Sequence, residues 1–137
     1  MACPSGRSPV PDSRPFEARF RVVRLGDGAF TGEGPFYRGA RMQLGPMALL
    51  ETGGVRVAVS SRKQQAADQA MFRHLGADPA RHPILALKSS VHFRADFEPI
   101  AGAILIVAAP GASPVDHRRL AYRKLRAGVR LMPSAAG

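Results

Sequence analysis

The sequence predicts a mixed α/β fold, in which antiparallel β-hairpins come first and a small βαβαβ unit with parallel strands follows. Up to residue 60 the chain shows apolar alternation and a Gly-Gly turn, and beyond residue 55 short apolar runs alternate with helix-like patterns. With 137 residues, of which 45% are hydrophobic, the chain is long enough for one compact domain. We expect that domain at residues 16–133, between disordered segments at 1–15 and 134–137.

The first strand is expected at residues 16–25, where apolar and polar side chains alternate. Phe16, Phe20 and Val22 fall on one face, and this period of two is typical of a half-buried strand. Several glycines follow within residues 26–39. We interpret them as turn residues, because no helix pattern follows as a phosphate-binding loop would require.

A β-hairpin is expected at residues 47–60. Two β-rich runs, 47–52 and 55–60, flank Gly53 and Gly54, and such a pair of glycines between two strands is a typical hairpin turn. A helix is then expected to begin after Asp68, whose side chain can cap it, and to end at Gly76.

Two further strands and one helix complete the predicted βαβαβ unit. The apolar runs 84–87 and 103–108 are interpreted as buried strands, and between them Ser89 or Ser90 can cap a helix that runs toward Phe97. Apolar strands joined by helices imply parallel pairing with right-handed crossovers.

Polar and basic side chains collect where the first two strands of this unit end. Ligands usually bind at the carboxyl ends of parallel strands, so we expect a binding edge there. Arginine could hold a carboxylate through two hydrogen bonds, and serine with a helix N-terminus would add donors. The candidate binding residues are Arg62, Gln65, Lys88, Ser89, Ser90, His92 and Arg94.

Structural roles remain open for these residues. Ser89 and Ser90 could be helix caps alone, His92 could be a structural histidine, and Arg62 could pair with Asp68 or Asp96. The sequence shows neither a paired-carboxylate site nor metal-binding histidine spacing. Lys88 and Ser89 would point to opposite faces of a strand, which argues against a Ser–Lys nucleophile pair. On its motifs alone, the chain therefore does not contain a complete active site.

The net charge of +10 allows a second function class. A domain this basic could bind nucleic acid or another polyanion. However, only three of the 20 basic residues are lysines, and arginine and alanine are abundant throughout, which indicates a compositional bias of the source. We therefore favour a solvated surface, or a face that meets an acidic partner domain, as the explanation of the charge.

The sequence lacks the features of secreted, membrane-spanning and disulfide-bonded proteins. The N-terminus has no apolar core of a signal peptide, no apolar run reaches the roughly 20 residues that span a bilayer, and Cys3 is the single cysteine. We expect a soluble cytoplasmic domain with no membrane contact.

Two segments resemble the C-terminal domain of the microcystinase C (MlrC) family of metallopeptidases. These are residues 61–68, with the sequence SRKQQAAD, and residues 87–100, with the sequence LKSSVHFRADFEPI. The resemblance covers roughly residues 16–133, and the string from Lys88 to Arg94 is its specific part. Supporting matches lie at residues 25–32, 53–57, 78–81, 109–111 and 122–126.

The resemblance implies a zinc-dependent hydrolase of small peptides, the namesake acting on linearised microcystin. In this family the zinc ligands belong to an N-terminal domain that the present chain lacks. The resemblance therefore implies that this chain is a C-terminal fragment whose partners are the zinc domain, in the same or a separate chain, and a small peptide substrate. It would bind no zinc itself and would be inactive alone. A truncated gene product, with apolar surface left exposed, is a third possibility.

Overall fold

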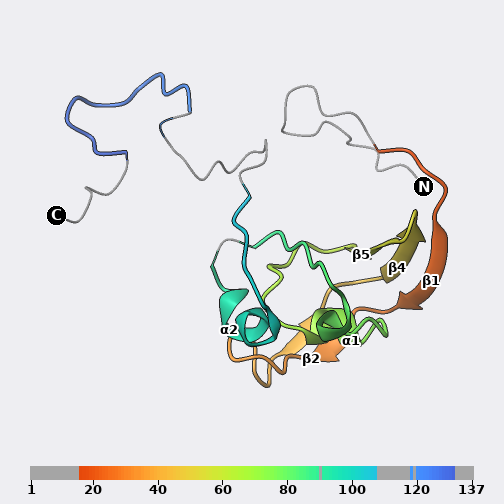
Figure 1. Ribbon diagram of the computed structural model, residues 1–137. Helices are drawn as coiled ribbons and strands as arrows, with labels where there is room; N and C mark the ends of the chain where they lie inside the picture. Colours follow the sequence, from red (N-terminus) through yellow and green to blue (C-terminus); the bar gives the residue numbers. More distant parts are fainter. Residues whose placement is uncertain (1–15, 90, 108–117, 119, 132–137) are drawn as a thin grey trace. The chain divides into compact units, whose positions relative to one another are not determined.

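The computed structural model describes residues 16–89, 91–107, 118 and 120–131 (Figure 1). The chain divides into two compact units, Glu17–Ile104 and a second one formed by Met1–Phe16 with Leu105–Gly137. The helices and strands assigned to described residues all lie in Glu17–Ile104. The first unit is mixed α/β, as predicted, with antiparallel sheets.

A three-stranded antiparallel sheet forms the centre of this unit. Its order is β1 (Arg21–Gly26), β4 (Met47–Thr52) and β5 (Val55–Ser60). The predicted hairpin is confirmed, because β4 and β5 pair directly, with Thr52 opposite Val55. Gly53 and Gly54 have φ angles of 54° and 79°, a left-handed conformation that a two-residue turn of type I′ needs and that glycine adopts without strain.

A second, two-stranded sheet lies in the glycine-rich region that the sequence indicated only as turns. It consists of β2 (Ala29–Thr31) and β3 (Arg41–Gln43), which pair antiparallel. Gly28 precedes it at φ 74°, and a Cβ atom at this position would lie 2.1 Å from the Gly45 carbonyl oxygen. Only glycine therefore allows the two chain segments to approach this closely.

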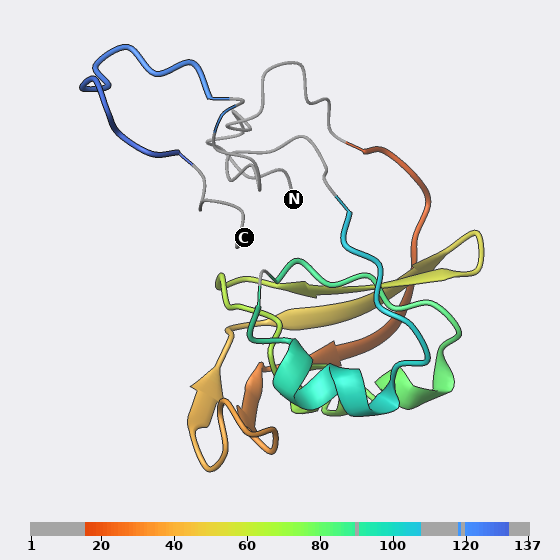
Figure 2. The same cartoon turned by 60° about the vertical axis from the view of Figure 1, so that its left-hand side comes forward.

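Short helices cover one side of the three-stranded sheet (Figure 1, Figure 2). Each is about one turn long, and along the chain α-helices alternate with 3₁₀-helices. In chain order they are α1 (Ala70–Arg73), η1 (Pro79–Arg81), α2 (Arg94–Phe97) and η2 (Glu98–Ile100).

The core lies between β4 and the helical layer. β4 is the central strand, and its Met47 and Leu49 are buried against Leu75 and Ala77, which follow α1. Leu44 completes the buried cluster, and half-buried side chains surround it: Val23, Phe30, Met42, Ala58 and Phe72.

The expected parallel βαβαβ unit is not found among the described residues. Segments 84–87 and 103–107 have no strand assignment, and every pairing of described strands is antiparallel; residue 108 lies outside the described part. Residues 82–89 nevertheless pass beside β5 in both views (Figure 1, Figure 2). Ile84 is 86% exposed, so this run lacks the covering layer that a buried parallel strand needs.

The two expected helices form, but both are shorter than predicted. The Asp68 side chain accepts a hydrogen bond from the Ala70 amide at 2.8 Å, and Gly76, at φ 75°, donates to the Arg73 carbonyl where the helical turn ends. The second helix begins at Arg94 rather than at Ser89 or Ser90, and no side chain caps it. Ser89 instead accepts a hydrogen bond from Gln65, and Ser90 lies outside the described residues.

Candidate functional site

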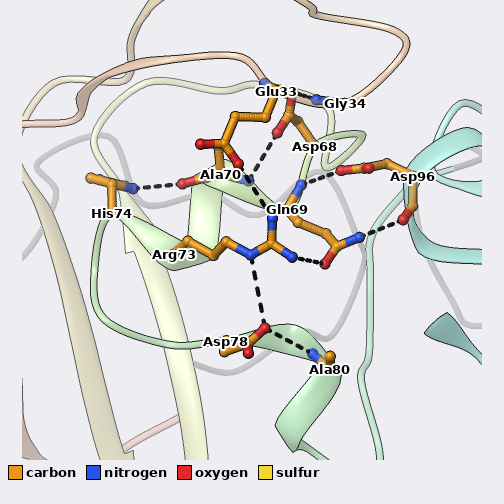
Figure 3. Close-up of polar contacts among 10 residues, drawn as sticks. All are labelled: Glu33, Gly34, Asp68, Gln69, Ala70, Arg73, His74, Asp78, Ala80 and Asp96. Atoms are coloured by element: carbon orange, nitrogen blue, oxygen red, sulfur yellow. Dashed lines mark hydrogen bonds and ion pairs between the residues drawn. The ribbon is translucent and has the colours of Figure 1, made fainter.

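Asp68 fixes the glycine-rich loop to the start of α1 (Figure 3). Its side chain is fully buried and accepts three backbone N–H bonds: from Glu33 at 2.9 Å, from Gly34 at 2.8 Å and from Ala70 at 2.8 Å. Hydrogen bonds to a charged acceptor are stronger than neutral ones. The carboxylate therefore determines where the loop over residues 33–37 lies.

Asp96 joins the second helix to the same point (Figure 3). Its carboxylate accepts the Gln69 amide at 2.6 Å, and the Gln69 side chain donates to the Asp96 carbonyl. A Cβ atom on Gly34 would lie 2.6 Å from the Asp96 carboxyl carbon, so the loop, α1 and α2 meet here at close range.

Arg73 links the edge of this network to its surroundings (Figure 3). Its guanidinium donates to Gln69 at 2.8 Å and to Glu33 at 3.3 Å, and lies 3.8 Å from Asp78. The ion pairs connect α1 to the loop on one side and to η1 on the other, but both are solvent-exposed and add little stability.

The structure brings together the two sequence segments that carry the candidate residues. Gln65 Nε2 donates to Ser89 Oγ at 3.1 Å, which connects the segment after β5 with the segment before α2. Next to it, Gln64 Nε2 donates to the Tyr37 hydroxyl at 2.6 Å. The glycine-rich loop is therefore a third component of the candidate site, which the sequence did not indicate.

An open hollow lies where the glycine-rich loop meets the residues around the start of α2. It is lined by Pro35, Phe36, Val91, His92, Arg94 and Ala95. The His92 ring packs on Phe36 with 4.2 Å between ring centroids, and Phe36 contacts Tyr37 edge-on at 4.6 Å. The lining is mostly apolar, with His92 and Arg94 as its polar members.

Arg94 keeps an exposed guanidinium at this margin. It pairs with Glu98 one turn later at 3.3 Å and lies 5.5 Å above the Phe93 ring, while its side chain remains 43% exposed. A solvent-facing ion pair of this kind contributes little to stability, so the guanidinium can exchange Glu98 for another carboxylate at small cost.

The remaining candidates lie less centrally. Arg62 donates to the Gln43 carbonyl at 3.4 Å, and the two carboxylates that could have paired with it, Asp68 and Asp96, accept backbone amides instead. Lys88 is exposed. Of the candidates, His92 and Arg94 line the hollow, while Gln65 and Ser89 are hydrogen-bonded to each other.

Aromatic residues of the glycine-rich loop were missed by sequence reasoning. Phe36 and Tyr37 follow Gly34 and Pro35, and only the glycines of this stretch were given a meaning. The available signal was the pair of adjacent aromatic side chains inside a polar loop, because loops carry a disproportionate share of binding residues and aromatic rings supply large contact areas.

A row of charges crosses the three-stranded sheet outside this site. Arg21, Glu51 and Arg56 are register partners on β1, β4 and β5, with ion pairs of 2.7 Å and 3.0 Å to the central carboxylate. The hydrogen bond from Arg21, followed by that from Arg56, lowers the pKa of Glu51 below its ordinary value.

Among the residues that the structure describes, no three His, Cys, Asp or Glu side chains gather into a group that could hold a metal ion. Within the same residues, no helix combines the length and apolarity needed to cross a bilayer.

Comparison with known proteins identifies the domain type. Residues 5–124 match the family model described as MlrC C-terminus. The chain belongs to this family. The resemblance seen in residues 61–68 and 87–100 is thereby confirmed.

Two relatives agree with this assignment. The chain is 28% identical over 103 residues to microcystinase C of Sphingomonas sp., a match that covers 75% of this chain and 20% of that protein. It is similar in structure, with a TM-score of 0.60 and 26% identity, to a protein from Mesorhizobium sp. BNC1 provisionally designated a metallopeptidase, covering 67% of this chain and 18% of that one. The chain thus spans about a fifth of the length of each relative.

Proposed function

We propose that this chain is the substrate-facing C-terminal part of a zinc-dependent hydrolase of small linear peptides. In this proposal the zinc and its activated water come from the remainder of the enzyme, as a further domain of the same chain or as a separate one. The match to the MlrC C-terminus family and to a protein named microcystinase C supports the reaction class.

The observation that carries the proposal is the contact between the two family-like segments, of which the second lines the hollow together with the glycine-rich loop. The Gln65–Ser89 hydrogen bond joins the two segments that resemble the family, and the Phe36–His92 ring contact adds the glycine-rich loop. A wall with a mostly apolar lining that includes a histidine and an arginine fits a peptide, which presents apolar side chains together with carbonyl and carboxylate groups.

The side chains of this wall have distinct proposed tasks. Arg94 binds a substrate carboxylate, or stabilises developing negative charge, through its two parallel N–H donors. Gln65 and Ser89 offer a donor and a hydroxyl that orient a peptide group, and His92 with Phe36 packs against a substrate side chain. Arg62, Lys88 and Ser90 belong to the proposed surface through their place in the family-like segments.

A graft tests this proposal. The C-terminal region of microcystinase C is replaced by the full 137-residue chain, and kcat/KM for small linear peptides is measured with zinc. We expect zinc-dependent hydrolysis by the graft and none by the isolated chain.

A single substitution then tests the role of the wall. Because a hydrogen bond to a charged group is worth about 1.5–3 kcal/mol, Arg94→Gln should lower kcat/KM by roughly 10- to 150-fold. Arg81→Gln, an exposed arginine on η1, is the matched control and should change kcat/KM less than twofold. Equal effects of the two substitutions would contradict the proposed role of Arg94, and robust hydrolysis by the isolated chain would contradict the claim that it is incomplete.

Polyanion binding is the second candidate function, and the net charge of +10 is the observation that favours it. Several arginines of the described part are already engaged in ion pairs with glutamates, among them Arg21, Arg56 and Arg73. The first proposal explains more of the molecule, because it accounts for the hollow as well as for the sequence segments around it.

A further inference from the structure

The three-stranded sheet is apolar on both of its faces. Leu49 of β4 points into the core, and because successive side chains of a strand alternate, Leu50 points to the opposite side. We call that opposite side the outer face. Register places Val22 of β1 and Val57 of β5 beside Leu50 on the outer face.

The outer face is continuous across the sheet. A second row joins Leu25, Ala48 and Val59, and Val55 lies opposite Thr52 at the hairpin end. Leu25 is 71% exposed and Val57 is 39% exposed, although valine and leucine on a strand are typical of a packed surface. The exposed apolar residues of the outer face are Val22, Leu25, Val55, Val57 and Val59.

Residues 84–87, next along the fold from β5, also expose apolar side chains. Their exposure alternates, with Leu85 and Leu87 half-buried and Ile84 and Ala86 exposed. The segment passes beside β5 (Figure 2), and Ile84 within it is 86% exposed. A sheet that is apolar on both faces is normally covered on both faces, and an apolar patch of this extent marks an interaction surface.

We propose that the outer face is the docking surface for the remaining part of the metallopeptidase, rather than for a second copy of this chain. This inference rests on the proposed function and adds the place of contact to it. Two observations select the occupant. The relatives are about five times longer than the matched region, so in them most of the protein lies outside this domain. Two copies would also bring net charges of +10 together, which opposes self-association.

A binding experiment tests the docking surface without turnover. The full chain is added to microcystinase C that lacks its C-terminal region, and the dissociation constant is measured. We expect Val57→Asp to weaken binding at least tenfold, since a carboxylate would be buried against an apolar surface. Ile100→Asp is the matched control, because Ile100 on η2 has the same 39% exposure, and it should change binding less than twofold. Equal effects of the two substitutions would overturn the inference.

A labelling experiment keeps the inference testable if the truncated relative does not fold. Val57→Cys or Ile100→Cys is introduced into a Cys3→Ser background, and the rate of thiol modification is compared between the isolated chain and the graft. We expect the cysteine at position 57 to react at least tenfold more slowly in the graft, and the cysteine at position 100 to react at similar rates in both. Equal rates at position 57, or slow reaction already in the isolated chain, would overturn the inference.

Light scattering on the isolated chain tests the competing occupant. We expect a monomer, and a dimer that Val57→Asp dissociates would overturn the assignment to the rest of the enzyme. The outcomes are separable from those of the proposed function. Arg94→Gln should leave docking and labelling unchanged while it lowers turnover, and failure of docking alone would leave the substrate-facing role intact.

Discussion

Asp68 provides the sharpest stability prediction. Its fully buried carboxylate accepts three backbone N–H bonds of 2.8 to 2.9 Å, from Glu33, Gly34 and Ala70. Asp68→Ala removes the acceptor and leaves these donors without a partner. A hydrogen bond to a charged group contributes about 1.5–3 kcal/mol, and an orphaned buried donor costs about 1–3 kcal/mol.

The three losses will not add fully, because the loop can relax and water can reach the exposed side of Glu33. We therefore expect Asp68→Ala to lower the free energy of unfolding by about 3–5 kcal/mol. That is a large part of the roughly 5–15 kcal/mol that stabilises a typical domain. Urea unfolding followed by circular dichroism measures this difference, and the urea dependence should keep its slope if the native fold is retained.

Asp78→Ala is the matched control for this substitution. Asp78 also accepts a backbone N–H at a helix start, from Ala80 at 3.2 Å, but its side chain is 43% exposed. Loss of an exposed cap costs about 0.5–2 kcal/mol. If Asp68→Ala destabilised the protein no more than Asp78→Ala does, the assignment of Asp68 as the anchor of the loop would be refuted.

Three further predictions concern charge and backbone. Arg21→Gln should raise the pKa of Glu51 toward its ordinary value, which NMR titration measures. Because the pKa of Glu51 is lower in the folded than in the unfolded state, this carboxylate stabilises the fold at pH values above its unfolded pKa. That contribution is lost as the pH falls through the folded pKa. An unchanged pKa would show that the pair does not persist in solution. Gly28→Ala should destabilise the fold far more than Gly39→Ala. Both glycines have nearly the same positive φ, but only at position 28 would a Cβ atom meet the Gly45 carbonyl, whereas no atom lies within 4 Å of a Cβ at position 39. Similar melting temperatures of the two variants would contradict the close approach at Gly28. Binding of the chain to single-stranded DNA should be weak and fall steeply with salt, whereas tight binding at physiological salt would favour the polyanion function.

Local signals in the sequence were sufficient for the hairpin and for the ends of α1. Gly53 with Gly54, Asp68 and Gly76 each act on residues a few positions away, so their roles follow from neighbouring sequence alone. The second sheet was missed because β2 and β3 have three residues each, too few for a visible period.

The parallel unit failed as a prediction for a different reason. Apolar runs such as 84–87 and 103–108 predict burial, but burial needs a covering surface, and the exposed Ile84 has none among the described residues. If the outer face is a docking surface, these apolar residues contact another part of the enzyme. A prediction that considers this domain alone then assigns their burial to the wrong interface.

The candidate site was predicted in part. The pairing of Gln65 with Ser89 brings the two expected segments together, whereas the contribution of Phe36 depends on the long-range anchor at Asp68. Asp68 can be identified from sequence as a helix cap. Its hydrogen bond to the Gly34 amide, 34 residues away along the chain, forms only in the folded structure and cannot be identified in the same way.

The central claim is the proposal that the hollow lined by His92 belongs to the substrate-facing surface, next to the metal that the rest of the enzyme would supply. Relaxation of histidine ring protons in the graft tests this most directly, with Mn²⁺ in place of zinc, because a paramagnetic ion broadens nearby resonances. The account predicts strong broadening of the His92 signal and much weaker broadening of His74, which stacks on Phe30 beside the core. Broadening of His74 equal to or greater than that of His92 would contradict the account.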